Sequence, residues 1–400
     1  MPDSASLMQF DRAAFRLDRS MTCAAPAEGA LAIELARCAA CSQAAPLVVT
    51  RSDTRAIRLA RAIRDAAPDL DVVLIPGWDV PLGERDQPSR AVLGQRAAAI
   101  AALSRPAKGT GRLVLATAEA ALQRLPPPDA WPDVALFITT DTLYDEEAWR
   151  KRLIAGGYIL DERIDEPGEA AFRGSVVEIF TGDADRPIRC DIVDGRVARI
   201  RTFDPASQRS TGDCDRITVH PVTEIPAAPE IVARLIQGLE GRRDPMAAGL
   251  AEELAAGRRP YAFERLLPLA YDRLPSVLEL LADSPVVMDE GVGDRLEAWF
   301  DELEDADAST MHLDRDAWET GLRERVVLTL EPDGQVSSSE APAVSERTLP
   351  RLAGERIAAG ESVIIAAANA ADAARMAERV AATTGRPVPV LDRWPVDGPL

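Results

Sequence analysis

The sequence predicts an α/β protein with a parallel sheet domain, an inserted α+β unit and a further small α/β unit. Residues 46 to 140 alternate apolar strands with amphipathic helices, the rhythm of a parallel sheet that carries helices on its faces. Residues 142 to 221 instead hold one helix and several strands in succession, which favours an antiparallel meander. Residues 331 to 346, rich in Ser, Pro and Glu, resemble a linker in composition.

The strands expected in the parallel sheet are short apolar runs, each followed by a helix or a turn. The first run, PLVVT, leads into a helix that Ser52 or Asp53 is expected to cap. A run in the later helical part, SPVVMDE, is expected to return to a sheet. The expected strands are 46–50, 70–79, 112–117, 133–140 and 284–290.

The inserted unit begins with a helix that starts near Asp145 and stops at Gly156-Gly157. Its strands are expected near 158–164, 173–180, 187–193 and 196–203.

The turn between the last two of these strands is Asp194-Gly195, a strong two-residue hairpin signal. With that turn, Val193 pairs with Arg196 and Asp191 pairs with Ala198. Ile188, Cys190, Ile192 and Val197 then share an apolar face, and Arg189, Asp191, Val193 and Arg196 share the opposite, charged face. That charged face is either a contact surface or an ordinary solvated face, and the pattern alone favours the second.

These patterns divide the chain into five parts. They are a first α/β part (1–141), the inserted α+β domain (142–221), a mostly helical return to the first domain (222–330), a linker (331–346) and a small α/β unit (347–400). The last unit is expected to be a β-α-β fragment with strands at 361–369 and 385–392, and the chain is expected to be a fragment, a truncated form or a split form.

Charge and apolar content limit the classes of protein. The formal net charge is −19, with 65 acidic and 46 basic residues, so the chain by itself is poorly suited to grip a phosphate backbone. It has no uninterrupted apolar stretch long enough to span a membrane, and its first residues do not resemble a signal peptide. We therefore expect a cytoplasmic protein with no membrane partner.

The five cysteines include one close pair, Cys38 and Cys41. A zinc site would need a second pair of ligands, and both histidines lie far away in the sequence. We expect the pair to be buried as small apolar side chains on one helix face, with no metal.

The signature of a nucleotide-binding loop is missing where the fold would place it. A phosphate-binding loop needs closely spaced glycines and a lysine, and the stretch MTCAAPAEGALAIELA has one glycine and no lysine. The acidic run at Asp145 fits a helix start better than a magnesium-binding strand end. We expect no cofactor and no catalytic residues.

Four stretches together resemble the N-terminal part of the transcription-repair coupling factors (Mfd). They are IPGWDVPLGERDQPS, GEAAFRGSVVEIF, PIRCDIVDG and FDPASQRS, in this order. The resemblance implies a UvrB-homology module, in which a degenerate ATPase-like domain carries an inserted domain that binds UvrA. It covers residues from about 20 to 395.

The resemblance also implies the residues of the UvrA-binding surface. Arg173, Gly174 and Arg189 match the family pattern, and Gly174 is expected to permit close backbone approach. Val193 stands where well-known members carry an aromatic side chain, so an anchor is missing there.

The function that this resemblance implies is recruitment of UvrA to stalled RNA polymerase, without chemistry in this chain. Full-length members also contact polymerase and double-stranded DNA, through domains that do not fit within 400 residues. Two alternatives remain open. One is a nucleotide-dependent, UvrB-like repair helicase fragment, and the other is an autoinhibitory module of a DNA translocase.

Overall fold

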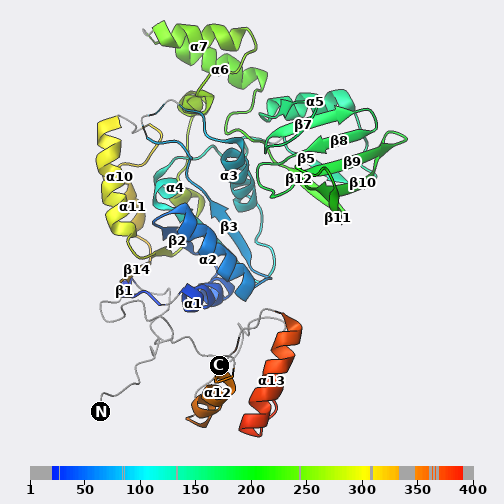
Figure 1. Cartoon of the computed structure of the whole chain (residues 1–400). Helices are drawn as coiled ribbons and strands as arrows, with labels where there is room; N and C mark the ends of the chain where they lie inside the picture. The colour runs from blue at the N-terminus through cyan, green and yellow to red at the C-terminus, as the bar shows by residue number, and fades with distance from the viewer. Residues whose placement is uncertain are drawn as a thin grey trace.

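The chain folds into a parallel-sheet domain, a mainly antiparallel inserted domain and further helical segments (Figure 1). The computed structural model describes residues 20 to 390, apart from residues 27, 83, 85, 132–133, 243–244, 307–309, 333–346, 360–362, 364 and 366–368. The α/β class predicted from the sequence is confirmed.

The larger domain is built on a six-stranded sheet in which all neighbouring strands are parallel. The strand order is β1-β14-β13-β2-β4-β3. The strands are β1 (Met21–Ala24), β14 (Val327–Glu331), β13 (Val286–Met288), β2 (Leu47–Thr50), β4 (Arg112–Thr117) and β3 (Asp71–Ile75).

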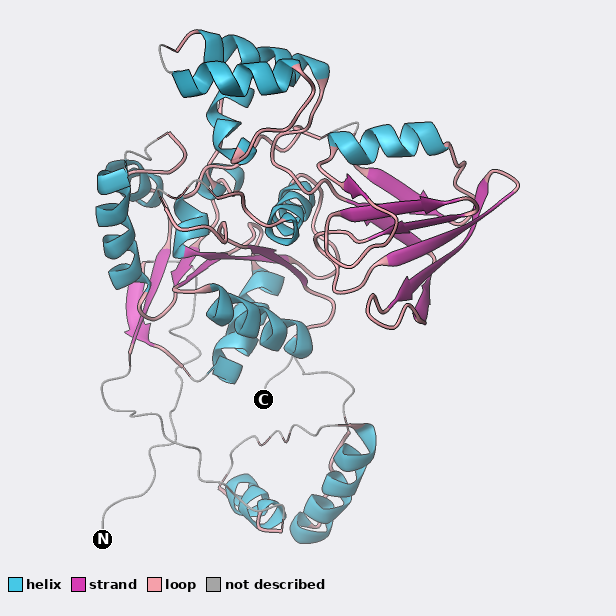
Figure 2. Ribbon diagram, turned by 45° about the horizontal axis from the view of Figure 1, so that its top comes forward, coloured by secondary structure: helices cyan, strands magenta, loops and turns pink. Residues whose placement is uncertain are grey.

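Helices cover both faces of this sheet (Figure 2), which explains why its strands are mainly apolar. In β2, Leu47 and Val49 join one hydrophobic cluster, whereas Val48 joins the cluster on the opposite face. The first cluster includes side chains from α3 (Arg90–Leu103), α4 (Ala118–Leu122), α9 (Val277–Leu280), α10 (Val292–Ala306) and α11 (Arg315–Leu322), and the second includes α1 (Glu28–Cys41) and α2 (Asp53–Ala66).

The inserted domain is a second six-stranded sheet, with α5 (Glu146–Ala155) along one side (Figure 2). Its strand order is β11-β10-β9-β8-β7-β6. The strands are β6 (Ile159–Leu160), β7 (Glu169–Arg173), β8 (Val176–Ile179), β9 (Ile188–Val193), β10 (Arg196–Phe203) and β11 (Ser210–Cys214).

Two strands mark where the chain enters and leaves this domain. β5 (Leu136–Thr139) and β12 (Arg216–Val219) pair antiparallel, and their inward side chains pack in the hydrophobic cluster of the inserted domain. The prediction that 133–140 joins the rhythm of the parallel sheet is therefore wrong, because a short apolar run does not reveal its partner strand.

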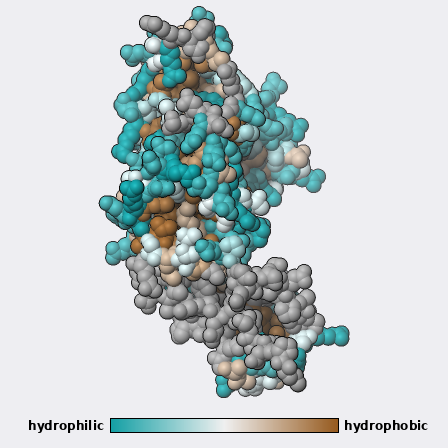
Figure 3. All heavy atoms as spheres, turned by 90° about the vertical axis from the view of Figure 1, so that its left-hand side faces the viewer, coloured by the Kyte–Doolittle hydropathy of each residue, from teal (hydrophilic) through white to brown (hydrophobic). Residues whose placement is uncertain are grey.

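The remaining elements are helical. After β12 come α6 (Pro229–Glu240), α7 (Pro245–Ala255), a 3₁₀ turn η1 (Phe263–Leu266) and α8 (Leu267–Ala270). In α10 the predicted stripe is confirmed, since Leu296, Trp299, Phe300 and Leu303 are all buried. Figure 3 shows the side of the molecule on which α10 lies, and this face is mostly hydrophilic with some hydrophobic patches.

The last two helices, α12 (Leu349–Ala358) and α13 (Ala370–Thr384), pack on each other through Ala353, Met376 and Val380. Most of the expected strand 361–369 and residues 391–392 lie outside the described residues. Residues 386–390 form no strand, so the second strand of the expected β-α-β fragment is wrong as far as the structure describes it. The division into five parts stays a prediction, although β14 already takes up residue 331.

Candidate protein-interaction site

The outer face of the inserted sheet carries most of its charged side chains. We call this the charged face; it points away from the hydrophobic cluster that α5 covers. Strand pairing places on it Arg173, Glu178, Arg189, Asp191, Val193, Arg196, Arg199, Arg201 and Asp213.

The Asp194-Gly195 hairpin determines which side chains reach this face. Both turn residues have positive φ, and Val193 pairs with Arg196 as predicted. The predicted pairing of Asp191 with Ala198 is wrong, because a bulge shifts the register and Arg199 takes that place. The bulge lets Val197 and Ile200 both face the core, so the strand keeps its apolar side inward.

Glu178 lies at the centre of the charged face and is buried between two arginines. Its side chain is 3% exposed, and strand pairing places it directly opposite Arg189. The carboxylate accepts from Arg173 through Oε2 and from Arg189 through Oε1, the latter at 2.6 Å. The sequence therefore identified the two arginines but missed the acid that joins them.

Gly174 forms the turn that ends β7 at Arg173. The sequence predicted one strand over 173–180, and this is wrong, because Gly174 and Ser175 form a two-residue turn between β7 and β8. Gly174 has a φ of 62°, which the first central position of such a hairpin turn requires. In the described chain no atom lies within 4 Å of where a Cβ would stand, so its expected role in close approach could concern only an external partner.

Two further ion pairs extend the charged face toward its edge. Arg201 binds both carboxylate oxygens of Asp191 at 2.7 Å, and Arg199 pairs with Asp213 at 2.6 Å. The hydrogen bond from Arg199 lowers the pKa of Asp213. Val193 is 56% exposed beside the turn, so its aliphatic side chain faces solvent.

The inserted domain is joined to the parallel-sheet domain through close contacts with α3. Gly94 on α3 meets Gly182 so closely that a Cβ on Gly94 would stand 2.6 Å from the Cα of Gly182. Nearby, the fully buried Arg96 pairs with the fully buried Glu224 and donates to the carbonyl of Pro76 at 2.7 Å. These contacts hold the two domains in a defined orientation.

The carboxyl edge of the parallel sheet is where ligands bind in open α/β sheets. Here Asp289, which follows β13, is 1% exposed and binds the guanidinium of Arg55 with both oxygens, at 2.7 and 3.1 Å. Arg55 and Arg58 both donate to Glu28 in the first turn of α1, each at 2.7 Å. Asp289 and Glu28 at this edge are thus bonded to arginines of the chain itself.

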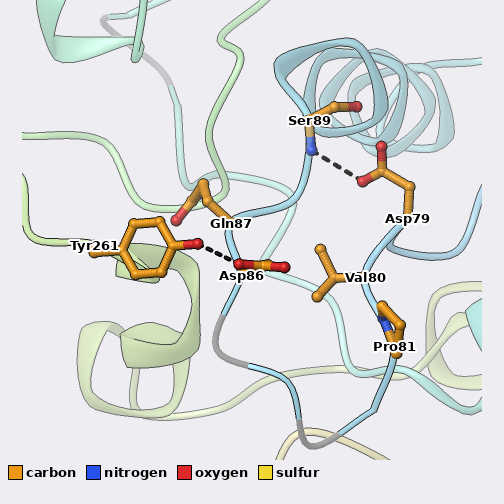
Figure 4. A pocket seen from close by; sticks show the side chains of 7 residues that line it. All are labelled: Asp79, Val80, Pro81, Asp86, Gln87, Ser89 and Tyr261. Carbon is orange, nitrogen blue, oxygen red and sulfur yellow. Dashed lines mark hydrogen bonds between the residues drawn. The ribbon is translucent and has the colours of Figure 1, made fainter.

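The stretch from 75 to 89, part of the family resemblance, lines a small pocket with Tyr261 (Figure 4). Tyr261 donates to Asp86, which raises the pKa of the phenol, and the amide of Ser89 donates to Asp79 at 2.9 Å. Both carboxylates of this pocket are therefore engaged by neighbouring groups.

The cysteine pair is divided between interior and surface. Cys38 is half-buried, which raises its pKa to about 11, and Cys41 is exposed, so the prediction that both are buried is wrong for Cys41. Within the described ranges no group of three or more His, Cys, Asp or Glu has an arrangement that could hold a metal ion. Nor does any helix in those ranges have the length and apolar character needed to cross a membrane.

Together, the elements define an α/β scaffold that carries an inserted, mainly antiparallel domain with a charged outer face. Residues 136–225 match the family model described as the UvrB interaction domain. This range contains the whole charged face and also β5 and β12.

Curated proteins similar to this chain include transcription-repair-coupling factors. The chain is 27% identical over 266 residues to that of Haemophilus influenzae, a match that covers 65% of this chain and 23% of the relative. It is 23% identical over 260 residues to the protein of Bacillus subtilis (61% and 22%) and 27% identical over 303 residues to that of Mycobacterium bovis (71% and 24%). The resemblance to their N-terminal UvrB-homology module is confirmed, and the chain spans less than a quarter of these relatives.

Proposed function

We propose that this chain is a non-catalytic interaction module that binds UvrA through the charged face. In this proposal it belongs to a transcription-coupled nucleotide excision repair factor and recruits UvrA to stalled RNA polymerase. The observation that carries the proposal is Arg173, whose side chain is 48% exposed while its far end is tethered to a buried carboxylate. An arginine presented in this way can offer a planar edge to a carboxylate of a partner.

The match to a UvrB interaction domain supports this choice of surface, because the matched residues include the whole charged face. The face holds five arginines against three carboxylates, on a chain whose net charge is −19. A locally basic face favours an acidic partner surface.

The ion pair between Asp289 and Arg55 at the carboxyl edge of the parallel sheet supports the non-catalytic part of the proposal. Asp289 and Glu290 follow β13, where related folds place the acids that hold a magnesium ion, but Asp289 is bound to Arg55 on both oxygens. A nucleotide would have to break this pair without the help of a phosphate-binding lysine. Isothermal titration with ATP and magnesium is expected to give no binding heat.

The test is the affinity of the purified chain for UvrA, measured beside Arg173→Ala. A hot-spot arginine costs about 2 kcal/mol on truncation, roughly thirtyfold in Kd. Arg61→Ala, at an exposed position on α2, is the matched control and is expected to bind as the wild type does. Equal affinity of wild type and a folded Arg173→Ala variant would overturn the proposed surface, and no binding by the wild type would overturn the function.

A further inference from the structure

The two arginines of the charged face differ in how far the chain itself engages them. Arg189 is 18% exposed and its guanidinium is bonded on several sides. Its Nε donates to Glu178 at 2.6 Å, its Nη1 to the carbonyl of Gln208 at 3.3 Å and its Nη2 to the side-chain oxygen of Gln208 at 3.2 Å. Its Cζ also lies 4.3 Å from the centre of the Phe203 ring. Arg189 therefore has little capacity left for a partner.

Arg173 is engaged at one end. Among the described residues it bonds Glu178 alone, through Nη2, and its side chain is 48% exposed. The other donors of its planar guanidinium are not used by the described residues. Arg173 can thus bind an external carboxylate without giving up its internal bond.

Glu178 connects the two arginines through different oxygens of one buried carboxylate. Arg189 donates to Oε1 of this carboxylate, and Arg173 donates to Oε2. Because Phe203 and Gln208 fix Arg189, they also fix the plane of the carboxylate to which Arg173 is bonded. The two arginines and the acid carry one unbalanced positive charge at the surface, next to Arg173.

We infer that Glu178 and Arg189 are positioning residues, and that Arg173 is the residue that touches a carboxylate of the partner. This inference rests on the proposed function and divides its surface into a contact residue and two supports. Holding a long side chain in its bound geometry before association removes part of the ordering cost of binding. The partner group that fits is a single carboxylate, which would balance the remaining charge.

A double-mutant cycle tests the inference with UvrA as the ligand. Glu178→Gln keeps the shape of the side chain but removes its charge, and we expect a five- to tenfold weaker affinity in the wild-type background. In the Arg173→Ala background the same substitution is expected to change the affinity less than twofold, because its effect passes through Arg173. An equal loss in both backgrounds, or tighter binding by Glu178→Gln alone, would overturn the inference.

Glu147→Gln is the matched control for charge. It removes one carboxylate from an exposed position of α5, on the opposite side of the same domain. We expect affinity within twofold of the wild type. If Glu178→Gln is too unstable to assay, Arg189→Lys replaces it, since it keeps the charge and loses the planar fork. Its loss of affinity is expected to vanish in the Arg173→Ala background, and a loss that persists there counts against the inference.

A readout without UvrA separates this inference from the proposed function. Nuclear magnetic resonance of arginine side chains reports how fast each guanidinium group rotates. In the wild type we expect slow rotation for Arg189, and faster rotation for both Arg189 and Arg173 in Glu178→Gln. Unchanged rotation in that variant would overturn the positioning roles even if UvrA binds. Conversely, a wild type that fails to bind UvrA while showing the expected rotation would overturn the proposed function alone.

Discussion

Two regions of this molecule both combine a buried carboxylate with arginines, and they differ in their balance of charge. At the edge of the parallel sheet, Asp289 and Glu28 meet two arginines, Arg55 and Arg58. On the charged face, Glu178 alone meets both Arg173 and Arg189. The first cluster is balanced and its central pair is largely hidden, whereas the second keeps one arginine in excess at the surface.

The two clusters therefore differ in whether they can gain from a charge outside the chain. A balanced cluster satisfies its own charges and gains nothing from an external ion. A cluster with an arginine in excess can still gain a charge-assisted pair from a partner. The comparison predicts that changes at Asp289 affect stability, and that changes at the charged face affect binding.

The largest expected effect comes from opening the balanced cluster with Asp289→Ala. This change leaves Arg55 without its main partner in a mostly buried place, and breaking such a pair costs about 3 kcal/mol. Urea unfolding followed by circular dichroism measures the loss, with Arg58→Ala, an exposed arginine, expected to stay within about 0.5 kcal/mol. UvrA affinity is expected to be unchanged; a weaker affinity would break the separation of the two regions.

The next effect tests whether the two regions are held in one orientation. Gly94→Ala places a methyl group against the backbone of Gly182, and overpacking of this kind costs about 2 kcal/mol. Gly29→Ala is the control, because no atom lies within 4 Å of its Cβ position and α1 gains helix propensity. Thermal unfolding compares them. A Gly94→Ala variant as stable as the wild type would show that the contact between domains can relax freely.

An aromatic side chain at position 193 tests whether the charged face can gain affinity for UvrA. Val193→Phe enlarges an apolar side chain that is 56% exposed, and we expect about tenfold tighter UvrA binding, or about 1.4 kcal/mol. Ile57→Phe on α2 starts from the same exposure and is expected to change nothing in binding. Both affinities are measured with the same titration method. A gain for both variants would indicate nonspecific hydrophobic binding of UvrA.

The smallest effect concerns the turn that presents Arg173. Gly174→Ala forces a side chain into the left-handed region at a cost of about 1 kcal/mol. Ser175→Ala at the neighbouring position is expected to have almost no effect on thermal unfolding. A neutral Gly174→Ala would mean that the turn changes its conformation, which circular dichroism and UvrA affinity together would reveal.

The sequence predicted the elements with strong local signals. The Asp194-Gly195 turn, the helix caps and the return of β13 to the parallel sheet were all visible because turn chemistry and apolar runs are local properties. The edge strand β1 and its neighbour β14 were missed, since four or five residues of mixed character carry no period of their own. The two strands pair with each other although they lie about 300 residues apart in the sequence, so no local pattern reveals the pairing.

The candidate site was predicted in part for the same reason. Alternation placed Arg189 on the outer face, but the same alternation gave Glu178 the appearance of a solvated strand residue. It is bonded to two arginines from other strands, and these side chains converge only after the sheet has formed. The bulge at Ala198 was likewise invisible, because one extra residue in a strand leaves no mark in composition.

The pairing of β5 with β12 has a consequence for how this architecture can be taken apart. Leu136 lies beside Val219, so the points where the chain enters and leaves the inserted domain are neighbouring strand residues, about 5 Å apart. A few residues would suffice to close the gap if the segment between them were excised. The same segment could be inserted into a loop of an unrelated host, since two ends about 5 Å apart match the span of a short loop. The arrangement makes the segment between β5 and β12 a part of the chain that can be removed or inserted as one unit.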